Sequence, residues 1–291
     1  MREAELVGPT SHIFVSQRLR LHYVDWGNRD APLMVLVHGG RDHGRSWDWV
    51  ARALRRDWHV VAPDLRGHGD SEWSQDGTYT FSAYLYDFAQ FIHQISTGPV
   101  TIIAHSLGAA VTLRYTGLFP ENVQKLVAIE GSGGMPPMFA KRAARPFVEK
   151  WRDWIDERRL VSGRQSRRYA TLGDAIARMR EENTGLSEEQ IMHLTLHAVT
   201  RNEDGSYSWK FDPYVRHSAP VDISSEDREA LWGRITCPVL LPWGRTSWNG
   251  DPDEDGTTAL FQNAHAVAFD AGHWLHHDRY EAFVAELGDF L

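Results

Sequence analysis

Cysteine is almost missing from this chain, because Cys237 is the only one among 291 residues. A single thiol excludes any disulfide within the chain, so disulfides do not stabilise the fold as they do in small secreted domains. Burial of apolar side chains must supply the stability instead. The composition allows this, since 42% of the residues are apolar and 24% are charged. The length suits one large domain or two ordinary ones.

An excess of positive charge is also missing. The net charge is −8 and the isoelectric point is about 6.0, which argues against a nucleic-acid-binding protein. No apolar run reaches the length of a membrane span, and the first ten residues, MREAELVGPT, lack the apolar core of a signal peptide. We therefore expect a soluble, cytoplasmic protein that acts on a small molecule.

Cofactor signatures are absent as well. No Gly-x-Gly-x-x-Gly loop follows the first predicted strands, so we expect no organic cofactor. No cluster of His, Cys and Asp shows a convincing zinc spacing, so we expect no metal. The sequence leaves the oligomeric state open.

Short apolar runs alternate with helical patterns in the first half of the chain. Continuous apolar runs of this kind favour strands that are covered on both faces, as in a parallel sheet. One intervening helix is indicated by a stripe of apolar residues at helical spacing. We predict an α/β fold, with helices on both faces of the sheet. The runs are 19–24, 32–37, 58–62, 100–104 and 125–129, followed later by 237–243 and 266–269, and the stripe is Tyr84, Leu85, Phe88, Phe91, Ile92 and Ile95.

This alternation stops near Gly131 and resumes after about a hundred residues. The intervening stretch has a helical stripe from Phe147 to Ile155, a capping box that begins at Ser187, and one expected strand within 202–211. A helical insertion in a sheet domain fits this pattern best. We therefore divide the chain into a core of residues 1–133 and 234–291 and an insertion of residues 134–233.

Ser106 occupies the position of a nucleophile in Ala-His-Ser-Leu-Gly (104–108), after an apolar strand and before a helical run. Strand and helix meet there at a strained turn, which requires small residues two positions before and after the serine. Ala104 and Gly108 are small, although the usual pattern has glycine at the first position. The Leu107 amide would lie at the helix N-terminus, where backbone donors favour an anion.

Two other segments follow predicted strands. In His38-Gly39-Gly40, the Gly40 amide could complete an oxyanion hole with Leu107. His273 follows the last strand, at the sheet edge where Ser106 also emerges, which singles it out as a general base among 15 histidines. His276 and His277 are interpreted as surface residues of the last helix, and His105 as a packing residue.

These motifs together resemble the α/β-hydrolase superfamily. The resemblance covers nearly the whole chain, most clearly 32–130 and 235–291, and it implies a mostly parallel eight-stranded sheet with an inserted helical cap. It also implies that Asp64 belongs to a structural turn. The motifs are HGG at 38–40, PDLRGHGDS at 63–71, AHSLG at 104–108 and AGHW at 271–274.

The catalytic acid departs from the pattern of this superfamily. Many relatives carry an Asp three residues after the strand that here ends at Gly244, but this chain has Ser247. A hydroxyl cannot stabilise an imidazolium as a carboxylate does. Some capped relatives place the acid at the position of Glu130, which is the favoured candidate. Asp251 and Asp253, in an acidic loop, are the alternatives.

The predicted cap gives only hints about the substrate. Aromatic residues, among them Phe139, Trp154 and Trp209, could line an apolar pocket, although most such residues fix a cap to its core. Residues 141–168 hold ten Lys or Arg against four Asp or Glu, which favours a solvated helix face over an anion site.

The leading hypothesis is hydrolysis of a small hydrophobic ester, thioester or lactone through an acyl-enzyme on Ser106. Carbon–carbon bond hydrolases of the same superfamily are the main alternative. Epoxide hydrolases and dehalogenases are disfavoured, because relatives with those activities carry Asp where this chain has Ser106. A catalytically silent ligand-binding protein is the alternative from another class, and the missing Asp at position 247 favours it.

Overall fold

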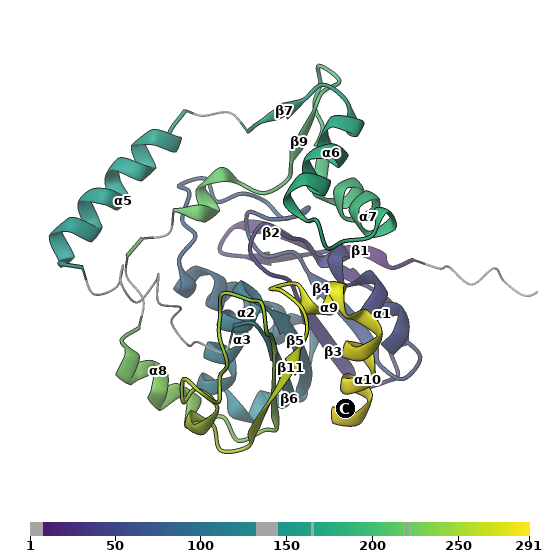
Figure 1. The fold of residues 1–291 in the computed structure, drawn as a ribbon, viewed down its shortest axis with the longest axis vertical. Coiled ribbons are helices and arrows are strands. Elements are labelled where there is room, and N and C mark those ends of the chain that lie inside the picture. The colour runs from purple at the N-terminus through teal and green to yellow at the C-terminus, as the bar shows by residue number, and fades with distance from the viewer. Residues whose placement is uncertain (1–7, 132–144, 164–165, 218, 221–222) are drawn as a thin grey trace, which may run out of the picture.

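The computed structural model describes residues 8–131, 145–163, 166–217, 219–220 and 223–291. Its main feature is an eight-stranded sheet with the order β1-β2-β4-β3-β5-β6-β10-β11 (Figure 1). The pairs β1–β2 and β2–β4 are antiparallel, and every other neighbouring pair is parallel. The mostly parallel eight-stranded α/β fold predicted from the sequence is therefore confirmed.

The predicted strands are all present, with ends that differ by one or two residues. To the eight-stranded sheet the structure adds one strand that the sequence pattern did not reveal, β1, which pairs with β2 at the edge of the sheet. The strands are β1 (Thr10–Ser16), β2 (Leu19–Asp25), β3 (Leu33–Val37), β4 (His59–Pro63), β5 (Val100–His105), β6 (Val123–Ile129), β10 (Val239–Gly244) and β11 (Ala264–Phe269).

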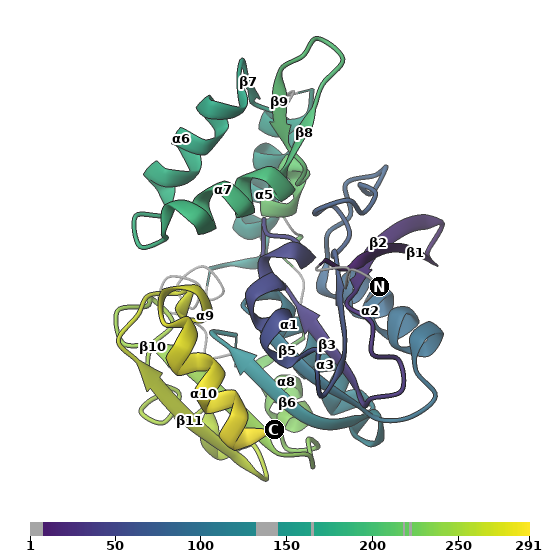
Figure 2. The ribbon, with the colours of Figure 1, turned by 90° about the vertical axis from the view of Figure 1, so that its right-hand side faces the viewer.

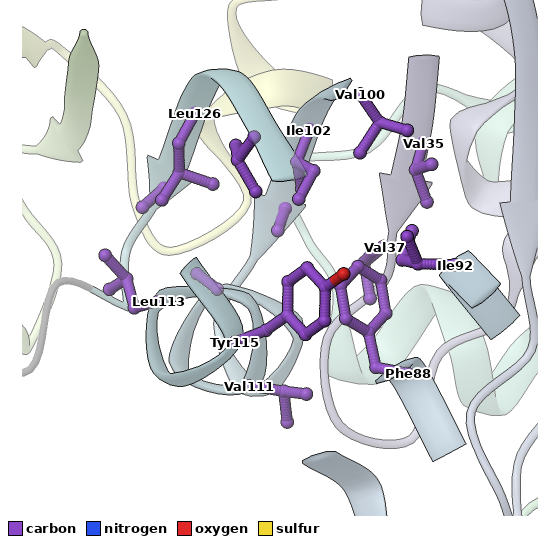
Figure 3. Close-up of a cluster of buried hydrophobic side chains, with 14 of the residues drawn as sticks. Val35, Val37, Phe88, Ile92, Val100, Ile102, Val111, Leu113, Tyr115 and Leu126 are labelled. Atoms are coloured by element: carbon purple, nitrogen blue, oxygen red, sulfur yellow. The ribbon is translucent and has the colours of Figure 1, made fainter. Parts of the chain in front are cut away.

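Helices cover both faces of the sheet. Helices α2 (Phe81–Ile95), α3 (Leu107–Leu118) and α8 (Ser225–Trp232) pack on one face, where Phe88 and Tyr115 lie against strands β3 and β5 (Figure 3). Helices α1 (Asp48–Leu54) and α10 (Tyr280–Phe290) pack on the other face. The two apolar layers explain why the central strands are apolar on both faces.

The predicted insertion is built from helices α5 (Phe147–Val161), α6 (Leu172–Glu182) and α7 (Glu188–Ala198) and a small sheet (Figure 2). The capping box at Ser187 is confirmed, since its hydroxyl accepts from the Gln190 amide and the Gln190 side chain accepts from the Ser187 amide. Strands β7 (Arg168–Tyr169), β9 (Tyr207–Trp209) and β8 (Val199–Arg201) form an antiparallel sheet in that order. The strand expected within 202–211 is present as β9, and the structure adds two short strands, β7 and β8, outside that stretch.

The insertion lies at one end of the molecule, beyond the edge of the sheet at which the parallel strands end (Figure 2). Its predicted start at residue 134 and the residue Phe139 lie outside the described residues, so the division at 134 and 233 stays a prediction. Within the described ranges, no helix is long and apolar enough to cross a membrane.

Candidate active site

Ser106 lies in the sharp turn between β5 and α3. Its backbone has φ 51° and ψ −114°, an uncommon conformation for a residue other than glycine. The turn is packed tightly, because a Cβ atom added to Gly108 would lie 2.6 Å from the His38 carbonyl oxygen. The Ser106 amide donates to the Ile129 carbonyl on β6 over 2.8 Å. The strained turn therefore holds the serine at the carboxyl end of the sheet.

His273 follows β11 and contacts Ser106. Its Nε2 lies 3.0 Å from Ser106 Oγ, and its Nδ1 lies 3.1 Å from Glu130 Oε2. A carboxylate accepts hydrogen bonds only, so Nδ1 carries the proton when the imidazole is neutral. Nε2 is then free to accept the hydroxyl hydrogen of Ser106. The Trp248 ring packs against this imidazole with a centroid separation of 4.6 Å.

Glu130 follows the last residue of β6 and is buried, with 3% of its surface exposed. Its backbone is left-handed, with φ 53°. Besides His273, two groups donate to the carboxylate. The Gly244 amide lies 2.6 Å from Oε1, and the Ser247 hydroxyl lies 2.5 Å from Oε2. The carboxylate is therefore held in place by donors from the end of β10.

The alternative acids are placed differently. Asp251 Oδ1 accepts the backbone amide of Asp253 over 2.9 Å, within the loop after β10. Among the described carboxylates, the one within hydrogen-bond distance of His273 belongs to Glu130. The role of Ser247 as a hydrogen-bond donor to Glu130 was not predicted, because in the sequence position 247 shows only that the usual Asp is missing.

Five consecutive strands of the sheet each place one of these residues at the same edge. Gly40 follows β3, Ser106 follows β5, Glu130 follows β6, Ser247 follows β10 and His273 follows β11. Ligands of open α/β sheets bind at this carboxyl edge. The Leu107 amide begins α3, where a helix leaves its first N–H groups without a carbonyl partner in the helix. A Cβ atom on Gly40 would lie 4.0 Å from the Leu107 side chain, so the two segments are neighbours.

The family model for the alpha/beta hydrolase fold matches residues 32–280. The chain belongs to the α/β-hydrolase fold family. Within this family, an esterase of Mycobacterium tuberculosis is 28% identical over 97% of this chain and 90% of the esterase. Epoxide hydrolase 3 of Mus musculus is 32% identical, but the match covers 42% of this chain and only 33% of that protein. The resemblance seen in the sequence motifs is thus confirmed.

A solved structure agrees with the fold of this α/β hydrolase. The thioesterase domain from the curacin biosynthetic pathway superimposes with a TM-score of 0.84, covering 96% of this chain and 99% of that domain. The two sequences are 22% identical, so this likeness shows the fold alone.

Other histidines lie near the site of this hydrolase but take no part in the hydrogen bonds that link Ser106, His273 and Glu130. His105 Nε2 lies 2.9 Å from the His273 carbonyl oxygen, and burial lowers the His105 pKa well below its usual value. The interpretation of His276 and His277 as surface residues was wrong, because they are 2% and 7% exposed. The short helix α9 (Leu275–Asp278) turns both rings inward, and His276 stacks on Trp47 at 4.8 Å.

Asp64 holds the turn that follows β4. It accepts the amides of Gly44 and Asp70 over 2.6 and 2.8 Å and bonds to His22 Nδ1 over 2.7 Å. These contacts, led among the stabilising ones by the His22 hydrogen bond, outweigh burial and lower the pKa of Asp64 far below its usual value. These contacts support the interpretation of residues 63–71 as a structural turn.

A cavity of about 670 Å³ lies between the core and the insertion. Gly40 and Trp274 line its core side, and Trp209 and Phe211 line it from the insertion. Trp154 is not among the lining residues. Its indole N–H donates instead to the His217 carbonyl oxygen, and its ring packs edge-on against Trp151, so it contributes to packing within the insertion.

One cluster beside this cavity has the donor set of a metal site. Atoms of Asp48, His193 and His197 lie within 4.8 Å of one another. However, Arg45 already binds the Asp48 carboxylate, with its Nη2 2.6 Å from Oδ2. A cation would meet this guanidinium, so we interpret the group as an ion-pair network that joins α1 to α7. A second group, His22, Asp64 and Asp70, belongs to the turn after β4.

Proposed function

We propose that this α/β hydrolase cleaves a carboxylic ester through an acyl-enzyme on Ser106. The observation that carries the proposal is the continuous hydrogen-bonded chain from Ser106 Oγ through His273 to Glu130. A nucleophile, a base and a group that orients the base are the parts that acyl transfer needs.

In the proposed reaction, Ser106 Oγ attacks the ester carbonyl while His273 Nε2 takes the hydroxyl proton. The amides of Gly40 and Leu107 stabilise the oxyanion that forms. His273 then gives its proton to the leaving alcohol as the carbon–oxygen bond breaks. Water attacks the acyl-enzyme by the same route and releases the acid and the free serine. Glu130 keeps the Nδ1 proton in place and stabilises the imidazolium in both halves.

The comparisons support a hydrolase, but they do not identify the type of bond that it cleaves. The similarity to an esterase along most of both chains favours ester cleavage. The partial match to an epoxide hydrolase weighs less, since epoxide hydrolases of this superfamily use Asp as nucleophile and this chain has Ser106. Thioesters, lactones and carbon–carbon bonds could use the same residues. The contact of Glu130 with His273 argues against the silent ligand-binding alternative.

We further propose that residues 134–233 form a cap that determines which substrates are accepted. Most of the cavity wall comes from this segment, including Trp209 and Phe211, while the hydrogen-bonded chain comes from the core. Chemistry and selectivity would then reside in separate parts of the chain.

The test is labelling by a fluorophosphonate, which reacts with an activated serine. We expect one label per chain in the native protein, none in Ser106→Ala, and hydrolysis of p-nitrophenyl esters that falls about 10⁴- to 10⁶-fold in that variant. A native protein that neither labels nor hydrolyses any ester, thioester or lactone would refute the proposal and favour a ligand-binding protein.

A further inference from the structure

The wall of the cavity carries an unusual number of arginines. Four of them, together with two carboxylates, line the space between the core and the insertion. The arginines are Arg41, Arg167, Arg178 and Arg216, and the carboxylates belong to Asp42 and Glu182. The positive excess noted at 141–168 does not account for this, because only Arg167 comes from that stretch.

The two carboxylates cannot balance the charge of all four arginines. Arg178 forms ion pairs with Glu182 and with Glu181, so it uses the acid on its own helix, α6. Burial raises the pKa of Asp42 to about 7, so near neutral pH much of this carboxyl is protonated. Arg41 and Arg216 form no ion pair with any acid in the described part of the chain, and both line the cavity.

Arg41 from the core and Arg216 from the insertion both line the cavity, and their charges influence one another. Burial is the main cause that lowers the pKa of Arg41, and the charge of Arg216 lowers it further. Glu182 opposes the shift, so its carboxylate also feels these charges. The two guanidinium charges repel one another, and an anion bound between them would relieve this repulsion.

The backbone of Arg41 adds a second, independent observation. Its φ is 65°, in the left-handed region that few residues other than glycine, Asn and Asp adopt. Strain of this kind persists where the surrounding structure requires it, often at a ligand site. Arg41 directly follows Gly40, and its long cationic side chain lines the cavity.

The arginines lie beside the residues of the proposed reaction. Arg41 follows Gly40, the candidate oxyanion donor, and both line the cavity. Trp274, which follows His273, lines it too. Ser106 and His273 do not themselves line the cavity, but Gly40 and Trp274 do, so a substrate that runs from Ser106 past Gly40 would enter the cavity beside Arg41.

We propose that this cavity binds a carboxylate of the substrate between Arg41 and Arg216, so that the preferred substrate is an anionic ester. This inference rests on the proposed function, and it replaces the hydrophobic substrate expected from the sequence with an anionic one. A guanidinium matches a carboxylate with two parallel N–H donors, which fixes orientation as well as affinity.

Paired esters that differ only in charge test this proposal. On the leaving-group side, 4-acetoxybenzoate is compared with its neutral isostere 4-acetoxybenzamide. On the acyl side, the mono-4-nitrophenyl ester of adipic acid is compared with the corresponding adipamic acid ester. We expect kcat/KM for at least one anionic ester to exceed that of its amide partner about 10- to 100-fold, as charge-assisted hydrogen bonds allow, and to fall as salt increases.

The variants Arg41→Gln and Arg216→Gln should each reduce this ratio about tenfold or more, mainly through KM. Arg56→Gln removes the same charge from an exposed site that does not line the cavity, so it should leave the ratio unchanged. Equal rates for the acid and amide partners, or an equal fall of the ratio in all three variants, would overturn the anion site and leave ester hydrolysis intact.

A binding measurement separates this inference from the proposed reaction. If no ester is hydrolysed, the reaction fails, and calorimetric titration with adipate and with adipamide decides the anion site by itself. Binding of adipate alone, lost in both cavity variants and kept in Arg56→Gln, supports the site. Absence of adipate binding, or equal binding of adipamide, overturns it.

Discussion

Ser247 donates its hydroxyl hydrogen to the Glu130 carboxylate across 2.5 Å, from the end of one strand to the end of its neighbour. Position 247 is where many similar hydrolases carry the acid itself. Here the carboxylate that contacts His273 follows β6, and the residue at the usual position is one of its hydrogen-bond donors. The site therefore keeps a carboxylate against His273 although the loop after β10 supplies none.

The first prediction concerns this carboxylate. Glu130→Gln keeps the shape of the side chain and removes the charge that steadies the imidazolium, so turnover of an ester should fall roughly 10⁴-fold. Asp251→Asn and Asp253→Asn should each cost less than about tenfold, because neither carboxylate contacts His273. Steady-state kcat of the three variants decides the matter. A large loss at either aspartate with a small loss at Glu130 would contradict the assignment.

A second prediction concerns Ser247. Ser247→Ala leaves one carboxylate oxygen with one donor fewer, and we expect a loss of roughly tenfold in kcat with little change in KM. Ser247→Asp alone places two carboxylates side by side, which raises the pKa of one of them and should impair activity.

The double variant Glu130→Gln, Ser247→Asp returns the acid to β10, and it should be more active than Glu130→Gln alone. Comparison of kcat among these variants under identical conditions measures the effect. Failure of the double variant, with a folded protein by circular dichroism, would show that position 247 is too far from His273 to orient it.

A third prediction contrasts two tryptophans of the insertion. Trp209 lines the cavity and donates its indole N–H to the Tyr169 hydroxyl over 3.0 Å, whereas Trp154 lies away from the cavity and bonds to the His217 carbonyl. Trp209→Ala should change the ranking of substrates by KM, and Trp154→Ala should change stability without altering the ranking. A panel of esters of rising acyl length gives the readout, and equal shifts in both variants would count against a cavity that contacts substrate.

A fourth prediction concerns stability at low pH. His38 is fully buried, and burial lowers its pKa to about 4. Its Nδ1 donates to the Gly39 carbonyl over 2.6 Å, and its Nε2 accepts the Leu65 amide over 2.9 Å, so both ring nitrogens are used by the neutral form.

The unfolded chain binds this proton with an ordinary pKa of about 6.5, so the stabilising contribution is complete above pH 6.5 and is lost as the pH falls toward 4. The contribution is on the order of 3 kcal/mol. Chemical denaturation at pH 7, 6 and 5 should show a falling free energy of unfolding, with a smaller slope in His38→Gln. An unchanged slope in that variant would show that other groups, such as His43 and His277, carry the dependence.

Much of this fold could be predicted because its central strands are apolar on both faces. The run at 100–104 matches β5, and the stripe from Tyr84 to Ile95 matches α2. The order of the motifs then placed Ser106 and His273 at one sheet edge. Their contact at 3.0 Å could not be derived from one sequence, since it depends on how two loops pack.

The errors have physical causes of the same kind. Strand β1 has an exposed edge and only partial burial, so Thr10–Ser16 lacks a continuous apolar run. The two unexpected strands of the insertion, β7 and β8, span two and three residues, which is too short for any periodicity. His276 and His277 are polar residues in a helix of four residues, and their burial follows from contacts with Trp47 and Trp49 that the local sequence does not reveal.

The pairing of β6 with β10 sets Leu126 beside Val239, two residues 113 positions apart in the chain. Closing so long a loop costs conformational entropy, but the cost grows only with the logarithm of its length. Doubling the loop adds about 0.6 kcal/mol, which is less than one good hydrogen bond contributes. The entropic cost of pairing β6 with β10 therefore depends only weakly on the number of residues between these strands. As far as loop closure is concerned, a segment of another length can therefore replace this one at little entropic cost to the strands that hold Ser106, Glu130 and His273.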